Sequence, residues 1–486
     1  MAVLPSPGYA LQPSAEQVPL STNYITDFNF LNQYLPDTYE KEFERYGNRT
    51  VASFLRLVGA EMPSNSDLIK WAEQGRLHTK YVKCSTTNVA TDDTATFEVK
   101  DTLIPGSGPG SGGIAIRVGQ TVHLSSNANV NLSNKAIVTA VDVALDTFTV
   151  AYYEAGGQTF GAISEGVTVF IYGSEFRKGT LGMEGSLEAN DTIFENSPII
   201  IKDKYAVSGS DMAQIGWVEI TTENGANGYL WYLKSEHETR LRFEDYLETS
   251  MIEAVPAETG SGAANNANPQ VGNKGSEGIF YVVNNRGNVW GGGNPTTLAD
   301  FDSIVQRLDK QGAIEENVIF LDRNFSFDID DMLATLNGYV SGAGASSGAS
   351  FGLFDNDINM ALNLGFQGFR RGYDFYKTDW KYLNDPTLRG GLSNVGSAQS
   401  KISGLLVPAG STTVYDQILG KNAKRPFLHV RYRASETEDR RYKTWITGSA
   451  GGATNSSLDA MEVHFLSERA VCTLGANNFF LFGSQV

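Results

Sequence analysis

The stretch YLWYLKSEHETRLRFEDYLETSMIEAV, residues 229–255, carries the clearest periodic signal in the sequence. Its apolar positions recur at steps of three or four, and Glu236–Arg240 and Glu238–Arg242 place opposite charges four residues apart. The residues on the repeating face are Leu230, Leu233, His237, Leu241, Leu247 and Met251. Pro256 would end the helix because it lacks a backbone N–H. We expect a helix of about 40 Å, long enough to be the spine of a domain.

Residues 85–173, upstream of this helix, have a different composition, rich in Thr, Val, Gly and Asn. Apolar residues alternate at Ile114-Ile116-Val118, Ile137-Thr139-Val141-Val143 and Val167-Val169-Ile171, which predicts short antiparallel strands. A turn at Ala144 to Thr147 would join two of them. We expect a small β-barrel or sandwich of about ninety residues. It resembles an insertion, because the strand-like segment before it and the segment Glu175 to Val218 after it have the pattern of one interrupted element.

The segment before this block is predicted to contain a helix and then a strand. Leu68, Ile69 and Ala72 have helical spacing between Ser66 and Gly75, which supply start and stop signals. The segment from His78 to Cys84 is predicted to form a strand. Residues 1–50 are rich in Pro and aromatic residues without a regular period. They are either a disordered tail or an extended arm docked on another domain or subunit, and the aromatic content favours the arm.

Downstream of the long helix, the sequence predicts an α/β section and then closing strands. Thr297 with Asp300 would cap a helix bearing Leu298, Phe301, Ile304, Val305 and Leu308 and ending at Gly312. A strand at Val318 to Leu321 follows, with further helices starting near Asp328 and Asp355. Apolar and polar residues alternate again at 428–433 and 463–465, which predicts strands. The apolar segment Phe479 to Phe482 is expected to be buried.

Composition limits the classes of function. The chain has 486 residues, 41% apolar and 19% charged, as a folded protein of about three units would have. Lys and Arg number 38 against 55 Asp and Glu, a net charge of −17 that disfavours sequence-independent binding to nucleic acid. Cys84 and Cys472 form no metal or disulfide motif. Neither a signal peptide nor a membrane span is evident, so we expect a cytosol-like setting.

No motif in the sequence predicts a catalytic, cofactor-binding or metal-binding residue. Gly108 to Gly113 fits the dinucleotide-binding pattern G-x-G-x-x-G, but a predicted strand follows it where a helix is required. The nucleophile-elbow pattern G-x-S-x-G occurs around Ser346 and Ser350, but both matches lie in a low-complexity segment. Asp328 to Asp331 lacks the glycine and glutamate of a calcium loop and more plausibly starts a helix. The histidines, His78, His123, His237, His429 and His464, show no ligand spacing. We therefore expect a protein that is not an enzyme.

A local basic segment stands out in this acidic chain. The segment contains Lys424, Arg425, Arg431, Arg433, Arg440, Arg441 and Lys443 against Glu436, Glu438 and Asp439. It could meet nucleic acid or the acidic face of a neighbouring copy. The acidic net charge favours the neighbouring copy.

Two stretches carry a resemblance to a known family. The text PIIIKDKYAVSGSDMAQIGWVEI at 198–220, with the helix at 229–255, resembles the extended loop and spine helix of the major capsid proteins of tailed bacteriophages. The text FLSERAVCTLGANNFFLF at 465–482 resembles their last peripheral-domain strands. The resemblance covers most of the chain and is closest to the capsid proteins of crAss-like gut phages. It implies the capsid shell fold that tailed phages share with herpesviruses.

The resemblance implies an α+β fold with five parts. These are an N-terminal arm at 1–50, an extended loop and lead-in at 51–84 and 174–222, the inserted small all-β domain at 85–173, a peripheral domain at 223–278 and 424–486, and an axial α/β domain at 279–423. It implies hexamers and pentamers in an icosahedral shell that encloses packaged double-stranded DNA. The virion would assemble in the host bacterial cytoplasm without a membrane.

The same resemblance implies partners. A portal and auxiliary or head-decoration proteins are expected, and the packaged DNA would be enclosed without sequence-specific binding. Many relatives carry a long charged helical scaffolding segment before the arm, and none is evident here. A separate scaffolding protein or earlier processing would explain this, and the initiating Met1 favours the separate protein.

Two other classes remain as alternatives. A secreted or surface binding module with a carbohydrate-binding β domain would explain the Gly/Asn/Thr-rich strands, but it leaves the missing signal peptide and the spine helix unexplained. An enzyme would require a convergent acid, base and nucleophile, which the sequence does not show.

Overall fold

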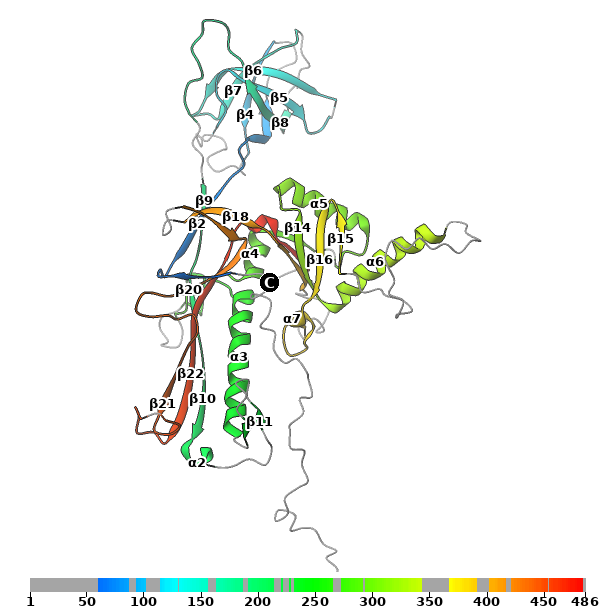
Figure 1. Cartoon of the computed structure of the whole chain (residues 1–486). Coiled ribbons are helices and arrows are strands. Elements are labelled where there is room, and N and C mark those ends of the chain that lie inside the picture. Colours follow the sequence, from blue (N-terminus) through cyan, green and yellow to red (C-terminus); the bar gives the residue numbers. More distant parts are fainter. Residues whose placement is uncertain are drawn as a thin grey trace, which may run out of the picture. The chain divides into compact units, whose positions relative to one another are not determined.

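The computed structural model of the chain is shown in Figure 1. It describes residues 60–86, 93–101, 114–129, 131–155, 163–186, 191–213, 220–221, 227–228, 231–264, 272–291, 293–342, 367–390, 402–416, 421–452 and 454–483. The chain divides into two compact units, Ser66–Ser197 and Met1–Asn65 with Pro198–Val486. The predicted arm at 1–50 and the predicted helix near Asp355 lie outside the described residues. None of the described helices is long and apolar enough to cross a membrane.

The smaller unit begins and ends with a two-stranded ribbon. Strand β2 (Ile69–Gln74) pairs antiparallel with β9 (Asp191–Asn196), so the two chain segments that flank the insertion lie side by side. The helix predicted between Ser66 and Gly75 is therefore wrong. Ser66 Oγ accepts a hydrogen bond from the Leu68 N–H at 3.2 Å, a local turn that leads into a strand instead of a helix. Trp71 and Phe194 face each other across the two strands with their ring centroids 6.3 Å apart, and this contact favours the strand over a helix.

Between these two strands lies a closed six-stranded barrel with the order β3-β4-β7-β6-β5-β8. Its strands are β3 (Lys80–Thr86), β4 (Thr94–Val99), β5 (Gln120–Ser126), β6 (Ser133–Asp142), β7 (Thr147–Tyr152) and β8 (Ile163–Ser174). Alternate residues of each strand fill a core in which Phe97 and Phe148 stack at 5.5 Å. Because β3 belongs to the barrel, the barrel begins before the predicted boundary at residue 85.

The predicted turn and most of the predicted strands of the barrel are present. Asp142 Oδ1 accepts hydrogen bonds from the Ala144 and Leu145 N–H groups in the turn between β6 and β7. The strand predicted at 114–118 is not formed, since the ladder of β5 begins only at Gln120. Ile116 is nevertheless buried in the barrel core, so its apolar character reflects packing and not strand pairing.

The larger unit contains a five-stranded sheet with the order β1-β20-β22-β10, in which β21 also pairs with β22. The strands are β1 (Ala60–Ser64), β10 (Ile199–Ser208), β20 (Leu428–Arg433), β21 (Lys443–Gly448) and β22 (Ala460–Thr473). Strand β10 follows β22 antiparallel from Ile199↔Arg469 to Ser208↔Ala460. The closing segment of the sequence is thus central to this sheet.

The predicted spine helix is present as α3 (Trp231–Glu253), and it lies along β10 and β22 (Figure 1). Its contact with the sheet centres on Phe243, which is fully buried and stacks on Phe465 at 5.7 Å. Leu247 joins Phe243 and the β22 residues Met461, Val463 and Phe465 in one cluster. Phe243 is absent from the predicted apolar face, although Leu247 and Met251 are buried as predicted.

A six-stranded mixed sheet forms the other part of the larger unit, with the order β13-β23-β17-β14-β16-β15. The strands are β13 (Asn288–Trp290), β14 (Glu316–Leu321), β15 (Gly368–Arg371), β16 (Tyr373–Asp379), β17 (Ile402–Pro408) and β23 (Phe480–Gly483). The resemblance assigns residues 424–486 to the peripheral domain. However, β23 lies between β13 and β17 in this second sheet, where Phe480, Leu481 and Phe482 are fully buried.

Two helices share a core with this sheet. Helix α5 (Leu298–Gln311) begins with the predicted capping box between Thr297 and Asp300 and ends at Gly312, whose φ of 69° suits glycine. Helix α6 (Arg323–Gly342) starts earlier than the predicted Asp328, because Asp322 Oδ1 accepts a hydrogen bond from the Phe325 N–H at 2.7 Å. Phe301, Phe325 and Phe482 belong to the same buried cluster.

Short elements complete the described fold. They are α2 (Gly209–Met212), α4 (Ile279–Arg286), α7 (Lys381–Asn384), the 3-10 turn η3 (Ala476–Asn478), and the strand pairs β11 (Ile220–Thr221) with β12 (Asn227–Gly228) and β18 (Ser411–Asp416) with β19 (Lys421–Pro426). Helix α4 buries Ile279, Phe280, Val282 and Val283 and contacts α3. It therefore ties the spine helix to the second sheet through apolar packing.

Candidate interaction surfaces

Metal-ligating side chains do not converge in the part of the chain that the structure describes. No group of three or more His, Cys, Asp or Glu residues there is placed to hold a metal ion. Asp328 and Asp330 lie in α6, where Asp328 accepts a hydrogen bond from Asn294 and Asp330 pairs with Lys377 at 2.6 Å. This acidic run is thus part of a helix, as the sequence indicates. The expected absence of catalytic, cofactor and metal residues stays a prediction.

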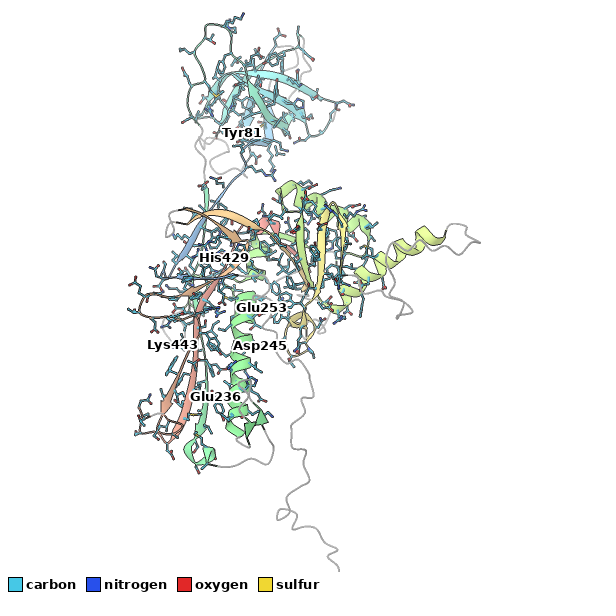
Figure 2. All side chains as sticks on the ribbon, viewed as in Figure 1. Tyr81, Glu236, Asp245, Glu253, His429 and Lys443 are labelled. Atoms are coloured by element: carbon cyan, nitrogen blue, oxygen red, sulfur yellow. The ribbon has the colours of Figure 1, made fainter. Side chains whose placement is uncertain are left out.

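The histidines are scattered over both units. His429, labelled in Figure 2, is 3% exposed, and burial together with the charge of Arg431 lowers its pKa to about 4. It is therefore neutral near pH 7 and serves the packing of β20. His237 is half-buried on α3. His464 lies on β22 against the ring of Trp445, 5.0 Å away.

Both cysteines are buried, unpaired thiols, Cys84 in the barrel and Cys472 in β22. Burial raises the pKa of each to about 12. Neither thiol is positioned to act as a nucleophile. The glycine motif at 108–113 and the serines Ser346 and Ser350 lie outside the described residues.

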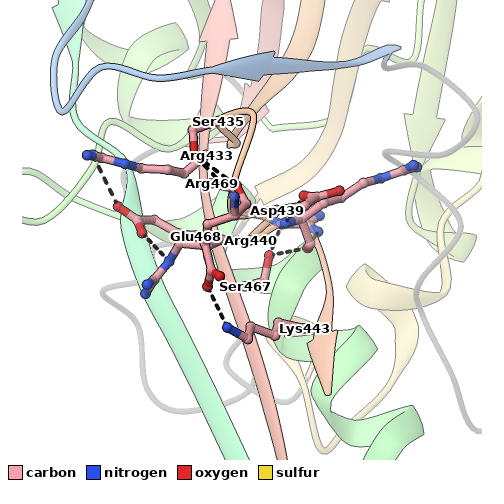
Figure 3. A network of polar contacts seen from close by, with 10 residues as sticks. Arg433, Ser435, Asp439, Arg440, Lys443, Ser467, Glu468 and Arg469 are labelled. Atoms are coloured by element: carbon pink, nitrogen blue, oxygen red, sulfur yellow. Dashed lines mark hydrogen bonds and ion pairs between the residues drawn. The ribbon is translucent and has the colours of Figure 1, made fainter. Parts of the chain in front are cut away.

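The basic segment at 424–443 is partly neutralised within the chain, as Figure 3 shows for its centre. Glu468 of β22 pairs with Arg440 at 2.7 Å and with Arg433 at 3.6 Å. Lys443 pairs with Glu438 at 2.5 Å, and Arg441 pairs with Glu61 of β1. These pairs engage Arg433, Arg440, Arg441 and Lys443, and they reduce the charge available to either of the two predicted partners, nucleic acid or an acidic neighbouring copy.

A second polar cluster joins the end of α3 to the segment after β16. Glu253, labelled in Figure 2, accepts a hydrogen bond from Tyr382 Oη at 2.6 Å and pairs with Arg389 at 2.7 Å. Burial, with the hydrogen bond to the Glu253 carboxylate, raises the pKa of Tyr382 far above its usual value. The Arg389 guanidinium lies 5.6 Å from the ring centre of Phe280. These contacts stiffen the joint between the two sheets of the larger unit.

The two faces of the β2–β9 ribbon differ. On one face Trp71 and Phe194 contact each other and are half-buried. On the other face Lys70 and Glu195 form an ion pair at 3.0 Å, and Ile193 is 67% exposed. A two-stranded ribbon has little apolar burial of its own and is at best marginally stable in water. The ribbon is therefore a candidate contact surface.

The sheet of the larger unit also presents apolar side chains to solvent. Trp445 and Ile446 of β21 are 36% and 42% exposed, and Ile200 of β10 is 53% exposed. Lys204 of β10 pairs with Glu462 of β22 at 3.1 Å, and its hydrogen bond lowers the pKa of Glu462. Among the described residues, β10 is paired with β22 alone. Lys202 and Lys204 lie on this edge strand, and charged side chains there discourage indiscriminate strand pairing.

Comparison with known proteins gives weak similarities only. No model of a protein family and no curated protein matches the chain. Among solved structures it is similar to one from Microbacterium phage Oxtober96, with 9% identity, 94% of this chain and 100% of that chain covered, and a TM-score of 0.38. The capsid structure of the cyanophage P-SCSP1u gives 10% identity, 65% and 80% coverage and a TM-score of 0.30. A structure from Mycobacterium phage Che8 gives 10% identity, coverage of 62% of this chain and 77% of that chain, and a TM-score of 0.29.

These TM-scores are too low to establish a common fold. The function proposed below therefore rests on the resemblance in the sequence and on the geometry of this chain.

Proposed function

We propose that this chain is a structural virion protein, the major capsid protein of a tailed bacteriophage. In this proposal it assembles as hexamers and pentamers into an icosahedral shell that encloses packaged double-stranded DNA. The observation that carries the proposal is the ribbon β2–β9, which exposes Ile193 and has a free edge on each strand within the described residues. Such a ribbon gains stability when a neighbouring subunit covers it.

The arrangement of elements supports the same function. A spine helix, α3, lies along the long antiparallel pair β10 and β22, and a second, mixed sheet is joined to it through α4. In the order of the chain, the ribbon comes before the spine helix, where the resemblance expects an extended loop. We assign the peripheral domain to α3 with the five-stranded sheet. The axial domain then consists of the six-stranded sheet with α5 and α6, and it includes β23.

The partners follow from the proposed role. A separate scaffolding protein and a portal would act during assembly, and auxiliary proteins could bind the finished shell. A net charge of −17 on each subunit would repel the enclosed DNA and keep it from adhering to the shell. The internal pairing of Glu468 with Arg433 and Arg440 is consistent with a protein that encloses DNA without gripping it.

The test of self-assembly is a substitution in the ribbon. Ile193→Asp places a charge where an apolar contact with a neighbour is proposed, so the variant should remain folded but fail to form particles. Sedimentation velocity measures the particle fraction, and circular dichroism measures the fold. Ile193→Val keeps a β-branched apolar side chain and should assemble like the unmodified chain. Particle yields that are equal for Ile193→Asp and Ile193→Val would contradict the proposal.

A further inference from the structure

The outer wall of the barrel contains a cavity of about 730 Å³ that the proposed shell function does not use. It lies across β5, β6 and β8, and the residue Tyr153 directly after β7 also lines it. The barrel's own apolar core lies on the inner side of these strands, so the cavity is separate from the core. Its volume is that of a small-molecule site.

A β-bulge presents an aromatic ring to this cavity. In the pairing of β5 with β8, Thr121 faces Gly173 and Val122 faces Ile171, which leaves Tyr172 between them without a partner residue in β5. Such an extra residue changes the direction of its side chain. Tyr172 is 46% exposed, and the Lys135 Nζ atom lies 5.8 Å from its ring centre. The bulge therefore places the ring of Tyr172 beside the ammonium group of Lys135.

A second ring is fixed on the same wall. Tyr153, 48% exposed, donates a hydrogen bond from Oη to Glu175 Oε2 at 2.6 Å. Desolvation and this carboxylate raise the pKa of Tyr153 to about 12, so its hydroxyl keeps its proton at neutral pH. The hydrogen bond restrains the Tyr153 ring, and about half of this side chain remains exposed to a ligand.

Two buried polar atoms in the lining have no hydrogen-bond partner among the described residues, Thr121 Oγ1 and His123 Nδ1. Thr121 is 5% exposed, and a buried polar atom without a partner destabilises the fold. A Cβ atom on Gly173 would lie 3.2 Å from Thr121 Oγ1, so the glycine keeps the space beside this hydroxyl open. Both atoms are buried, so the ligand contacts are assigned to the exposed rings of Tyr153 and Tyr172.

We propose that this cavity binds a neutral saccharide. A sugar ring presents an apolar face, which suits the exposed rings of Tyr153 and Tyr172, and a rim of hydroxyls that can both donate and accept hydrogen bonds. The lining contains a single lysine, Lys135, against the carboxylates Glu154 and Glu175. That balance disfavours single-stranded nucleic acid, whose bases could stack on these rings but whose phosphates require a cationic surface. The inference is independent of whether the chain assembles into a shell.

The test measures binding of neutral oligosaccharides to the full chain by saturation-transfer NMR. The probes are cellohexaose, maltohexaose, xylohexaose and the hexamer of N-acetylglucosamine, with single-stranded oligo-dT and a glycine–serine peptide as probes of other classes. At least one neutral oligosaccharide should bind. Tyr172→Ala should weaken that binding about tenfold, because one stacking surface is lost. Phe170→Ala is the matched control, since Phe170 is 42% exposed on the same strand but does not line the cavity.

A second variant covers the case in which Tyr172→Ala does not fold, as judged by circular dichroism. Glu175→Gln keeps the shape of the side chain and removes its charge, and it should also weaken binding of the same oligosaccharide. No binding to any neutral probe would overturn the proposal. So would binding that survives Tyr172→Ala and Glu175→Gln unchanged, or oligo-dT binding that these variants abolish.

Discussion

The barrel of the smaller unit is built from antiparallel strands and the β10–β22 sheet of the larger unit mainly so, with β1 parallel to β20, but only the barrel closes on itself. In the barrel, each of the six strands pairs with two neighbours, and the core residues Phe97 and Phe148 are inaccessible to solvent. The sheet leaves one edge of β10 unpaired among the described residues, and Ile200 and Trp445 are partly exposed on it. Closure removes the strand edges that other chains could pair with.

This difference separates what the chain stabilises alone from what requires neighbours. The barrel pairs both edges of every strand and buries a core of its own, so we expect it to fold without a partner. The ribbon β2–β9 and the open sheet keep apolar surface that a second copy can bury. Changes in one region should therefore leave the other region intact, and the following predictions test that separation.

The largest expected effect is in the barrel core. Phe97→Ala removes a fully buried ring that stacks on Phe148 at 5.5 Å and should cost about 3 to 5 kcal/mol of barrel stability. Hydrogen exchange should show lost protection in β4 and β7 with no change in α3. Val143→Ala, at an exposed position in the turn after β6, is the control and should have little effect. Equal loss of protection in α3 would refute the separation of the two regions.

A smaller effect is expected from pH in the larger unit. The pKa of His429 is about 4 in the folded chain against 6.5 for the free side chain. Between these values the unfolded chain binds a proton that the folded chain does not. The stabilisation is therefore complete above pH 6.5 and is lost as the pH falls toward 4, by about 3 kcal/mol in all.

His429→Gln removes this titration. The free energy of unfolding of the larger unit should then fall less steeply with pH between 6.5 and 4, as measured by urea denaturation. His78→Gln, at an exposed histidine of the smaller unit, is the control and should keep the original pH dependence. An unchanged slope in His429→Gln would show that burial of this imidazole does not contribute to acid sensitivity.

The smallest effect concerns one helix cap in the larger unit. Thr297→Ala removes the side chain that accepts a hydrogen bond from the Asp300 N–H and should cost about 1 kcal/mol. Amide exchange in the first turn of α5 should then be about fivefold faster, while the barrel is unaffected. Ser303→Ala, within the same helix and exposed, should change exchange little. Identical exchange in Thr297→Ala and Ser303→Ala would exclude a role for the cap.

The sequence predicts elements best where local chemistry and long-range packing agree. Helix α3 follows from its long apolar repeat, and α5 follows from Thr297, Asp300 and Gly312, all of which act within the helix itself. Alternation likewise indicates strands in the barrel. The sequence does not predict helix α4, because it has only eight residues and no side chain caps its first turn.

The failures occur where a distant segment decides the conformation. The spacing of Leu68, Ile69 and Ala72 fits a helix, yet β9 pairs with this segment from more than a hundred residues away. Residues 480–483 form β23 in the second sheet, because β13 and β17 supply partners for both of its edges. Neither partner can be identified from the local sequence.

The candidate site was not predicted from sequence for the same reason. Tyr172 is an ordinary member of an alternating run, and only the register between β5 and β8 shows that it is the bulged residue. Tyr153 and Glu175 are 22 residues apart and meet only because β6 and β5 lie between β7 and β8 in the barrel. The sequence did raise a carbohydrate-binding β domain as an alternative, but it supplied no residues for it.

The most direct test of the central claim, that subunits of this chain cover one another in a shell, is electron microscopy of the purified protein. The chain is expressed alone and together with a candidate scaffolding protein, and light scattering gives the particle mass. We expect rings of five or six subunits, tubes or closed shells in at least one condition. A monodisperse monomer in both conditions would contradict it.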